Sequence, residues 1–294
     1  GNLLWAKKDS VDFLSENDNY AFSETEEGDF ITVGGGYMMK RNSEGNELWS
    51  IPYDDFGVFS MTKTNDGNVI LGGRSNYNAS LRKINTDGET IWTSVIDLDS
   101  SIAYSVTQSF DGGYLLTGIN YGENDVLVIK TDENGDSLWT RTYDGLGGND
   151  RGNCIIETSN GDIIAVGEIH SRSIDTYIIK LSYNGNIIWS NIFSELAACY
   201  SITQSQDGNF VGYSWGGAST NTTHLFKIND NQDFIWNNQL NCLPANGDKS
   251  FQELNNGGFV CVGSLNNSIA LNKTNEFGIV SSSDENIIET NSYK

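Results

Sequence analysis

The feature that most constrains the fold is a ten-residue segment that recurs along the chain. KTDENGDSLW, residues 130–139, begins with a lysine and ends nine residues later with a tryptophan. The same lysine-to-tryptophan spacing returns in KRNSEGNELW from Lys40, KINTDGETIW from Lys83, KLSYNGNIIW from Lys180 and KINDNQDFIW from Lys227. A sixth copy, KTNEFGIVSS from Lys273, has Ser282 in place of the tryptophan, and the chain starts with GNLLW, the second half of the motif. The motif therefore marks a repeat of about 46 residues.

A second module lies between these segments and keeps two spacings in all six repeats. A small residue is followed after seven positions by a turn glycine, and after six more by a glycine or serine. The small residues are Ala21, Ser60, Ser105, Cys154, Ser201 and Ser250. The turn glycines are Gly28, Gly67, Gly112, Gly161, Gly208 and Gly257. The third position is Gly34, Gly73, Gly118, Gly167, Ser214 and Gly263.

Each repeat offers four short apolar strands, which we call A, B, C and D in chain order. Asn-Gly and Asp-Gly pairs separate them, 32 glycines stand against 2 prolines, and no helical periodicity is sustained. Four antiparallel strands recurring every 40 to 50 residues are typical of a propeller blade. We therefore predict an all-β fold, a single β-propeller over residues 1–294. The small residue of strand A fits the crowded innermost position, and the tryptophan fits the wide outer end of the blade.

The ends of the chain leave two possible blade counts. Trp5 ends an isolated D-type strand, while the sixth repeat has a degenerate D strand at Ser282. We predict six blades, with the N-terminal strand completing the sixth and removing an exposed sheet edge. ENIIETNSYK, from Glu285, resembles the start of another A strand, so residues 283–294 form either a terminal strand or tail, or the start of an incomplete seventh blade.

Three segments carry a family resemblance. DGGYLLTG, DVLVIKTDENGDSLWTRTYDG and GGNDRGN resemble the tandem propeller repeats of bacterial and archaeal secreted or surface proteins, distantly similar to quinoprotein propellers. The resemblance implies an extracellular, cell-surface or periplasmic location, the chain being the mature part of an exported protein. No residues match a quinone site, so no cofactor is expected. The Asp150 that precedes strand A in one repeat has no equivalent at Phe56, Ser101, Ala197 or Asn246.

Charge and composition exclude several partners. The formal net charge of −22 repels the phosphates of nucleic acids and anionic membranes. No apolar run reaches the roughly 18 residues of a membrane span. Four cysteines, Cys154, Cys199, Cys242 and Cys261, form no CxxC pair, and with only His170 and His224 beside them no zinc site is expected. We expect Cys154 and Cys261 to be small buried residues within strands. We also expect the protein to be a monomer.

Residues 130–139 also admit a metal interpretation. Asp132, Asn134 and Asp136 alternate around Gly135 as the ligands of a calcium loop do. The same letters describe a β-hairpin with an Asn-Gly turn. The five sister segments keep the turn but place Ser, Asn, Thr, Tyr or Gln at the ligand positions, and SLWTRTY lacks the later bidentate acid. The hairpin is favoured, and no metal site is predicted.

The spacings separate a constant end from a variable end. Because strands alternate in direction, the A–B and C–D turns lie at one end, and the B–C and D–A loops at the other. At the constant end the repeated lysines are expected to pair with acids such as Asp66, Asp111 or Asp207. At the variable end the glycine-to-lysine gap varies from 6 to 13 residues, which is typical of a binding surface on a rigid scaffold. The candidate ligand-binding residues there are Tyr53, Arg74, Tyr121, Arg151, His170, Arg172 and Trp215.

These observations favour a non-catalytic extracellular or cell-envelope binding module that engages a glycan or a protein. An enzyme is the first alternative, since an acid pair such as Asp54 and Asp97 could form the dyad of a glycosidase or lyase, but acids are too abundant here to discriminate. His170 lacks both a nucleophile elbow and a metal triad. A purely structural surface module is the second alternative.

Overall fold

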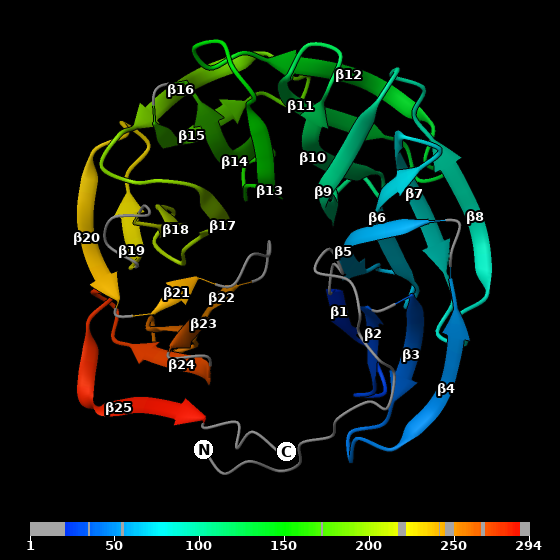
Figure 1. Ribbon diagram of the computed structural model, residues 1–294, viewed down its shortest axis with the longest axis horizontal. Helices are drawn as coiled ribbons and strands as arrows, with labels where there is room; N and C mark the ends of the chain where they lie inside the picture. The colour runs from blue at the N-terminus through cyan, green and yellow to red at the C-terminus, as the bar shows by residue number, and fades with distance from the viewer. Residues whose placement is uncertain are drawn as a thin grey trace. The chain divides into compact units, whose positions relative to one another are not determined.

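A computed structural model describes residues 21–34, 36–53, 56–171, 173–216, 222–240, 242–244, 250–265 and 268–288. These residues form 25 strands in six antiparallel sheets, so the predicted six-bladed all-β propeller is confirmed. Figure 1 shows the strands of each blade side by side in chain order. Among the described ranges no helix has the length and apolar character needed to cross a membrane.

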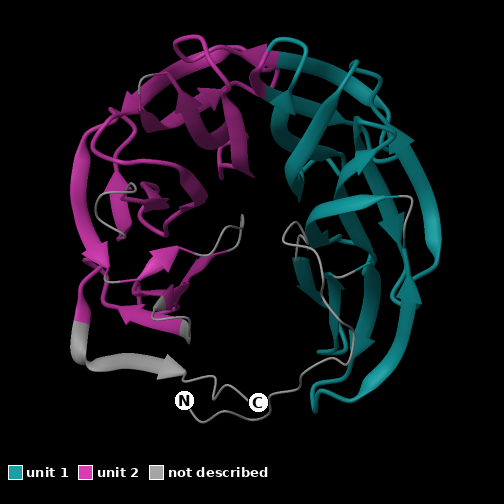
Figure 2. Cartoon of the chain, viewed as in Figure 1, with its two compact units in different colours: residues 1–123, 127–141 teal, residues 124–126, 142–294 magenta. Residues whose placement is uncertain are grey.

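The chain divides into two compact units, coloured separately in Figure 2. Unit 1, residues 1–123 and 127–141, holds blades 1 and 2 and most of blade 3. Blade 1 consists of β1 (Ala21–Glu24), β2 (Phe30–Gly34), β3 (Tyr37–Arg41) and β4 (Glu47–Pro52). Blade 2 consists of β5 (Gly57–Lys63), β6 (Val69–Ser75), β7 (Asn78–Ile84) and β8 (Thr90–Val95). Blade 3 consists of β9 (Ser101–Gln108), β10 (Tyr114–Asn120), β11 (Asp125–Thr131) and β12 (Ser137–Tyr143).

Unit 2, residues 124–126 and 142–294, holds blades 4 to 6. Blade 4 consists of β13 (Arg151–Glu157), β14 (Ile163–His170), β15 (Ile174–Leu181) and β16 (Ile187–Phe193). Blade 5 consists of β17 (Cys199–Gln204), β18 (Phe210–Trp215), β19 (Thr223–Ile228) and β20 (Phe234–Leu240). Blade 6 consists of β21 (Leu243–Pro244), β22 (Phe251–Glu253), β23 (Phe259–Leu265), β24 (Ser268–Thr274) and β25 (Val280–Ile288).

The sixth blade takes its fourth strand from the C-terminal part of the chain. β25 pairs with β24, and it runs through Ser282 and on to Ile288. Residues from Glu285 onward therefore continue this strand, and the alternative of a seventh blade starting there is wrong. Trp5 and the rest of residues 1–20, which we expected to complete blade 6, lie outside the described residues.

Consecutive blades within each unit bury apolar side chains between their sheets. One core cluster joins blades 1 and 2, another blades 2 and 3, and two more join blade 4 to 5 and blade 5 to 6. Three of the repeated tryptophans lie against the glycine of the C–D turn in the following blade. The pairs are Trp49 with Gly88, Trp92 with Gly135, and Trp236 with Gly278. Their predicted place in the inter-blade packing is thus confirmed for these three.

The small residue of strand A lies where neighbouring A strands meet. Ser60 Oγ accepts a hydrogen bond from Val106 N of the next blade, at 3.2 Å, and Cys154 Sγ lies 3.9 Å from Ile202 O. All four cysteines are buried free thiols. Burial raises the pKa of Cys199 and Cys261, in each case with a further contribution from a neighbouring cysteine, so these thiols stay protonated at neutral pH.

The lysines at the constant end pair as the sequence predicted. Their Nζ atoms lie within 3.2 Å of an aspartate oxygen in five blades. The pairs are Lys40 with Asp29, Lys83 with Asp66, Lys130 with Asp111, Lys180 with Asp230 and Lys227 with Asp207. Their role in joining turns and strands is therefore sufficient to explain their recurrence.

The opening segment is a hairpin turn. Asp132 Oδ1 accepts the backbone N–H groups of Asn134 and Asp136, both at 2.9 Å, and Gly135 has φ of 83°. An asparagine makes the same two bonds in the sister turns at Asn42, Asn85 and Asn275. The aspartate is therefore a turn residue, replaceable by a neutral amide.

Candidate ligand-binding site

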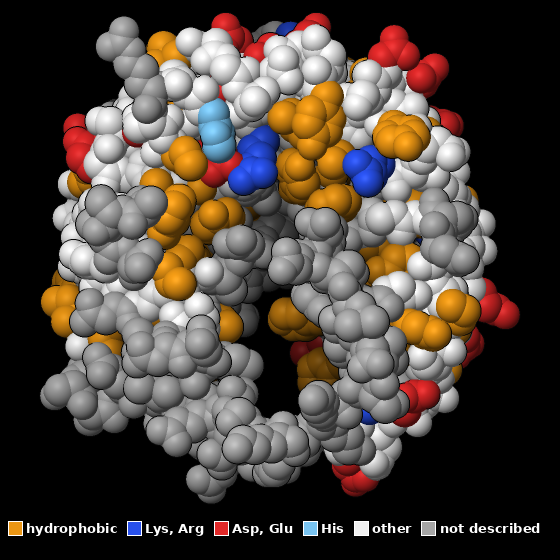
Figure 3. Space-filling model, viewed as in Figure 1, with side chains coloured by type: hydrophobic (Ala, Val, Ile, Leu, Met, Phe, Trp, Pro, Cys, Tyr) orange, Lys and Arg blue, Asp and Glu red, His pale blue; other side chains and the backbone are white. Residues whose placement is uncertain are grey.

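The predicted site residues occupy several distinct settings at the variable end. Arg172 lies outside the described residues, as does Asp54 of the alternative acid pair. Arg74 and Tyr121 lie in unit 1, and Arg151, His170 and Trp215 in unit 2. Tyr53 follows β4, where it packs half-buried against a core cluster with Val33 and Phe56. Figure 3 shows one face of the molecule, on which several hydrophobic side chains lie beside lysine or arginine side chains.

An exposed aromatic group in unit 1 brings two of the predicted residues close together. This tyrosine patch consists of Phe59, Arg74, Tyr77, Tyr104 and Tyr121. The rings of Phe59 and Tyr104 meet edge to face with centroids 5.2 Å apart, and Tyr104 Oη lies 3.5 Å from Tyr121 Oη. The guanidinium carbon of Arg74 lies 5.9 Å from the centroid of the Tyr77 ring. These contacts involve residues of β5, β6 and β9 and of the B–C turns of blades 2 and 3.

Two backbone hydrogen bonds hold the loops of the tyrosine patch together. Ser101 N donates to Tyr77 O at 2.8 Å, and Tyr121 N donates to Ser100 O at 3.0 Å. The B–C turns of blades 2 and 3 are thus fastened to the same D–A loop. Tyr77 is 75% exposed and Tyr121 44% exposed, so the fixed backbone presents both rings to solvent.

The turn that carries Tyr77 has an unfavourable residue in its second position. Ser75 pairs with Asn78, which leaves Asn76 and Tyr77 as a two-residue hairpin turn with φ of 49° and 66°. Positive φ at both central residues defines the type I′ turn, in which Asn-Gly is strongly preferred. A tyrosine in place of that glycine is strained by roughly 1–2 kcal/mol. A large aromatic ring thus stands, mostly exposed, at a turn position that favours glycine.

A β-bulge places two patch residues that the sequence interpretation missed. Strand A shifts register around Phe59 in blade 2 and around Tyr104 in blade 3. Opposite each bulge stands a repeated glycine, Gly73 or Gly118, whose missing Cβ lets the carbonyl oxygen of strand A approach. Bulges re-aim side chains next to functional sites. The available signal was an aromatic residue directly before the small residue, as in Phe59-Ser60 and Tyr104-Ser105.

The predicted residues of blade 4 form an ion-paired cluster. Glu168, a buried residue of β14, contacts Arg151 Nε and lies 3.0 Å from His170 Nε2. Burial and the charge of Glu168 raise the pKa of Tyr200 to about 12, against the opposing charge of Arg151. The partner found for the imidazole of His170 is thus an acid, not a hydroxyl or thiol nucleophile. This arrangement fixes the side chains of Arg151 and His170 at the variable end of blade 4, where both can make polar contacts with a ligand.

Three carboxylates near the same cluster satisfy the spacing of a cation site. Oxygens of Asp125, Asp144 and Asp150 lie within 4.8 Å of one another. Asp150 is fully buried, and its two oxygens accept N–H groups of Gly145 at 2.8 Å and His170 at 3.3 Å. Asp144 Oδ1 accepts Gly147 N at 2.7 Å. Backbone donors thus cap two of the three carboxylates, Asp144 and Asp150, and these two acids order their loops.

Trp215 closes the B strand of blade 5. The backbone N–H of Trp215 donates to Ala198 O at 2.8 Å, and its backbone carbonyl accepts from Ala197 N at 2.9 Å. The residue is half-buried. The backbone is therefore firmly held against the D–A loop. The residues that follow Gly216 lie outside the described ranges up to Thr222.

The fold and the loop geometry define the chain as a six-bladed β-propeller with an aromatic surface at its variable end. A protein of unknown function from Bacteroides caccae is 15% identical over 77% of this chain and 84% of its own, with a TM-score of 0.58. A protein from Lactobacillus plantarum is 15% identical over 89% of this chain and 82% of its own, with a TM-score of 0.64.

The WD40 propeller domain of Doa1 is also similar, at 15% identity over 85% of this chain and 77% of that domain, with a TM-score of 0.60. At these identities the likeness shows the propeller fold alone. No protein-family model matches the chain, and no curated protein matches its sequence.

Proposed function

We propose that this propeller is a non-catalytic binding module and that the tyrosine patch is its contact surface. The observation that carries the proposal is Tyr77, an exposed ring held on a turn whose backbone favours glycine. Strain that persists beside an exposed aromatic group is characteristic of a recognition site.

A protein segment is the partner that the patch composition favours. Tyrosine and arginine are enriched at protein interfaces, where they supply most of the binding free energy. The patch combines four aromatic rings with Arg74, and its loops are ordered in the free chain, so little conformational entropy is lost on binding. Among the similar chains, one belongs to the mitotic checkpoint complex, 10% identical over 97% of this chain and 85% of its own with a TM-score of 0.62, an example of a propeller within a protein assembly.

A glycan is the second candidate, supported by the flat exposed rings of Tyr77 and Tyr121, which can stack on sugar rings. The location that we propose, outside the cell or in its envelope, rests on the resemblance of the repeats to secreted and surface propellers.

The test is a screen of peptide and glycan arrays, followed by affinity measurements on three variants. Tyr77→Gly removes the ring and suits the turn, and Arg74→Ala removes the cation. Tyr183→Ala is the control, because Tyr183 is also an exposed tyrosine, at 44% against 75% for Tyr77, but lies in a C–D turn at the constant end. We expect the first two variants to weaken binding by about 10- to 30-fold, the loss of a strong interface contact, and the control to bind normally.

Two results would overturn the proposal. One is the absence of any binder on either array. The other is a binder whose affinity is unchanged in Tyr77→Gly and Arg74→Ala, which would place recognition elsewhere. A preference for glycans over peptides would support the second candidate.

A further inference from the structure

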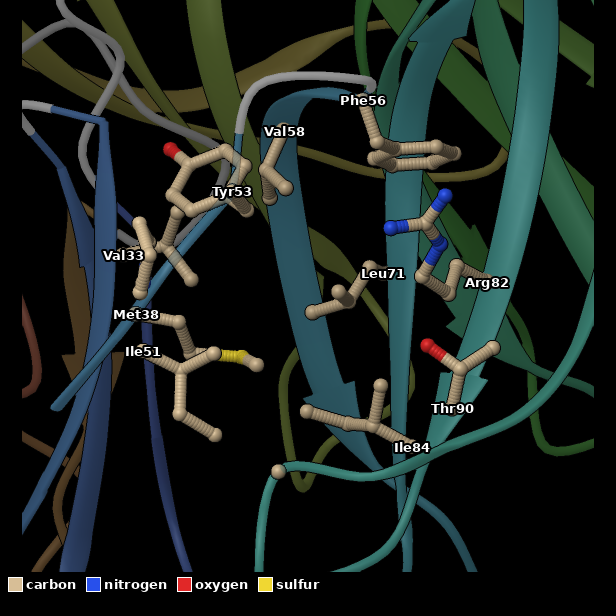
Figure 4. A pocket seen from close by; sticks show the side chains of 12 residues that line it. Val33, Met38, Ile51, Tyr53, Phe56, Val58, Leu71, Arg82, Ile84 and Thr90 are labelled. Atoms are coloured by element: carbon tan, nitrogen blue, oxygen red, sulfur yellow. The ribbon is translucent and has the colours of Figure 1, made fainter. Parts of the chain in front are cut away.

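A cavity between the sheets of blades 1 and 2 has a lining that a simple packing defect does not explain. Its volume is about 140 Å³, and the wall is formed by apolar side chains from both blades, including Val33, Met38, Val58 and Leu71. Arg82 of β7 is part of the same wall. Figure 4 shows its guanidinium beneath the ring of Phe56, with a terminal nitrogen directed toward the space beside Leu71. Most of the residues that line the cavity are thus apolar, with a cation on one side.

Arg82 departs from four of the other five repeats, in which the position is buried and apolar. The position directly precedes the repeated lysine of strand C, and in blade 6 it is the half-buried Asn272. The corresponding residues of blades 1, 3, 4 and 5 are Met39, Ile129, Ile179 and Phe226, which are at most 6% exposed. Arginine at this place in blade 2 therefore replaces a core side chain with a charged one.

Sister interfaces show what the position does when it is apolar. Ile129 is a fully buried member of the cluster between blades 2 and 3, and Phe226 is one between blades 4 and 5. Both side chains fill the space between their sheets. At the interface of blades 1 and 2 the guanidinium instead lies over the Phe56 ring, 4.8 Å from its centroid, and its Nε donates to Thr93 Oγ1 at 3.1 Å.

Phe56 contacts Arg82 from a position that varies between the repeats. The corresponding residues are Ser101 in blade 3, Asp150 in blade 4 and Ala197 in blade 5, and Phe56 is 2% exposed. An aromatic and a cationic side chain thus contact each other at the wall of the cavity. The wall also includes Pro52 and Thr90, which are exposed, so the cavity borders solvent on the side of β4 and β8.

We propose that this cavity is a binding site for a small aromatic or branched aliphatic carboxylate. An apolar cavity of about 150 Å³ accommodates benzene, so a single ring or a short branched chain fits the space. The carboxylate would lie against the Arg82 guanidinium, whose planar N–H edge matches its two oxygens. The ring of Phe56 holds the guanidinium in position through a cation–π contact. This site is separate from the tyrosine patch and does not depend on the function proposed for it.

The test uses methionine-methyl NMR, because the chain has only three methionines, Met38, Met39 and Met61. Met38 lines the cavity, whereas Met39 and Met61 do not. The protein labelled with ¹³C at the methionine methyl groups is titrated separately with benzoate, benzene and benzylamine. We expect benzoate to shift the Met38 signal in a saturable manner and the other two signals little, benzene to shift it more weakly, and benzylamine to leave it unchanged.

Variants then test the role of the cation. Arg82→Ile restores the apolar residue of the sister blades, and Arg82→Gln removes the charge while keeping a long side chain. Both should weaken the benzoate response by about tenfold or more, the effect of losing a charge-assisted hydrogen bond. Arg141→Gln, a change at an exposed arginine of β12, is the control and should bind benzoate as the wild type does.

The outcomes separate the proposal from its alternatives. A Met38 signal that does not respond to benzoate overturns it. Equal responses to benzene and benzoate, or to benzylamine, reduce the site to an unselective apolar void. An undiminished benzoate response in both Arg82 variants would show that the guanidinium does not hold the carboxylate.

Discussion

The C–D turn of blade 5 should become more stable when Gln232 is replaced by glycine. Gln232 has φ of 70°, and at the same position the other five repeats have Gly45, Gly88, Gly135, Gly185 and Gly278 with φ between 71° and 83°. An L-residue in this left-handed region is less stable by roughly 1–2 kcal/mol. Glycine loses roughly 0.5–1 kcal/mol more conformational entropy than alanine on folding. The difference leaves a net gain of about 0.5–1 kcal/mol for Gln232→Gly.

The turn itself is expected to survive the substitution unchanged. Its hydrogen bonds, Gln232 N to Asn229 O at 3.0 Å and Asn229 N to Asp233 O at 3.1 Å, are made by the backbone. For a chain of this size the gain corresponds to a rise in Tm of about 1–3 °C. Urea unfolding of the wild type and the variant, followed by tryptophan fluorescence, gives the free-energy difference directly.

Gly135→Ala is the matched control, in the equivalent turn of blade 3. Its φ of 83° is strained for alanine, and the added Cβ would lie 2.7 Å from Trp92 Cζ3. We expect a loss of at least about 1–2 kcal/mol. A loss of stability in Gln232→Gly would refute the reasoning, because the glutamine side chain would then contribute more through packing than its backbone strain removes.

Two further predictions concern ionisable groups, the carboxyl of Asp207 and the four cysteine thiols. Burial of Asp207 acts to raise its pKa, but hydrogen bonds from Lys227, Ser205 and Asn209 outweigh it and hold the pKa well below the usual range. A carboxyl whose pKa is lowered by folding stabilises the protein above its unfolded pKa of about 3.9, and this contribution disappears as the pH falls through the folded value. Asp207→Asn should therefore reduce stability by about 0.5–1 kcal/mol at pH 7, and the difference from the wild type should shrink as the pH falls below about 4; a difference as large at pH 2 as at pH 7 would contradict this. The four buried thiols should remain unreactive toward a thiol reagent such as DTNB in the native protein and react fully in denaturant, whereas rapid native reaction of even one cysteine would contradict their burial.

Much of the fold could be predicted because the same motif spacings recur in six sequence repeats. Rigid spacings such as Lys83 to Trp92 require the same strand lengths and turns in every repeat, and the pairing of Lys83 with Asp66 follows from two fixed turns at one end of a blade. The fourth strand of blade 6 was harder to predict, since Ser282 lacks the tryptophan that marks it elsewhere. Its pairing with β24 depends on backbone hydrogen bonds and not on that side chain.

The candidate site could be predicted only in part. Loop length drew attention to the variable end and selected Arg74 and Tyr121, which belong to the tyrosine patch. It missed Phe59 and Tyr104, because a bulge re-aims residues that a regular strand would place elsewhere. It also placed Tyr53 among the ligand-contacting residues, whereas this ring is half-buried against a core cluster. Strand alternation alone does not reveal a bulge, since one inserted residue changes the face of its neighbours.

The contact of Trp49, Trp92 and Trp236 with the C–D turn glycine of the following blade also bears on how such a chain can evolve. One sequence repeat contains both partners of this contact, but they belong to two different interfaces, since Trp92 lies against Gly135 while Gly88 receives Trp49. A gene segment that holds such a repeat therefore carries one tryptophan and one glycine, and copying or removing it in register leaves the tryptophan of the preceding repeat facing the glycine of the next one. Unequal recombination can change the number of repeats without creating a mismatched interface, whereas point mutation of either partner affects two blades at once.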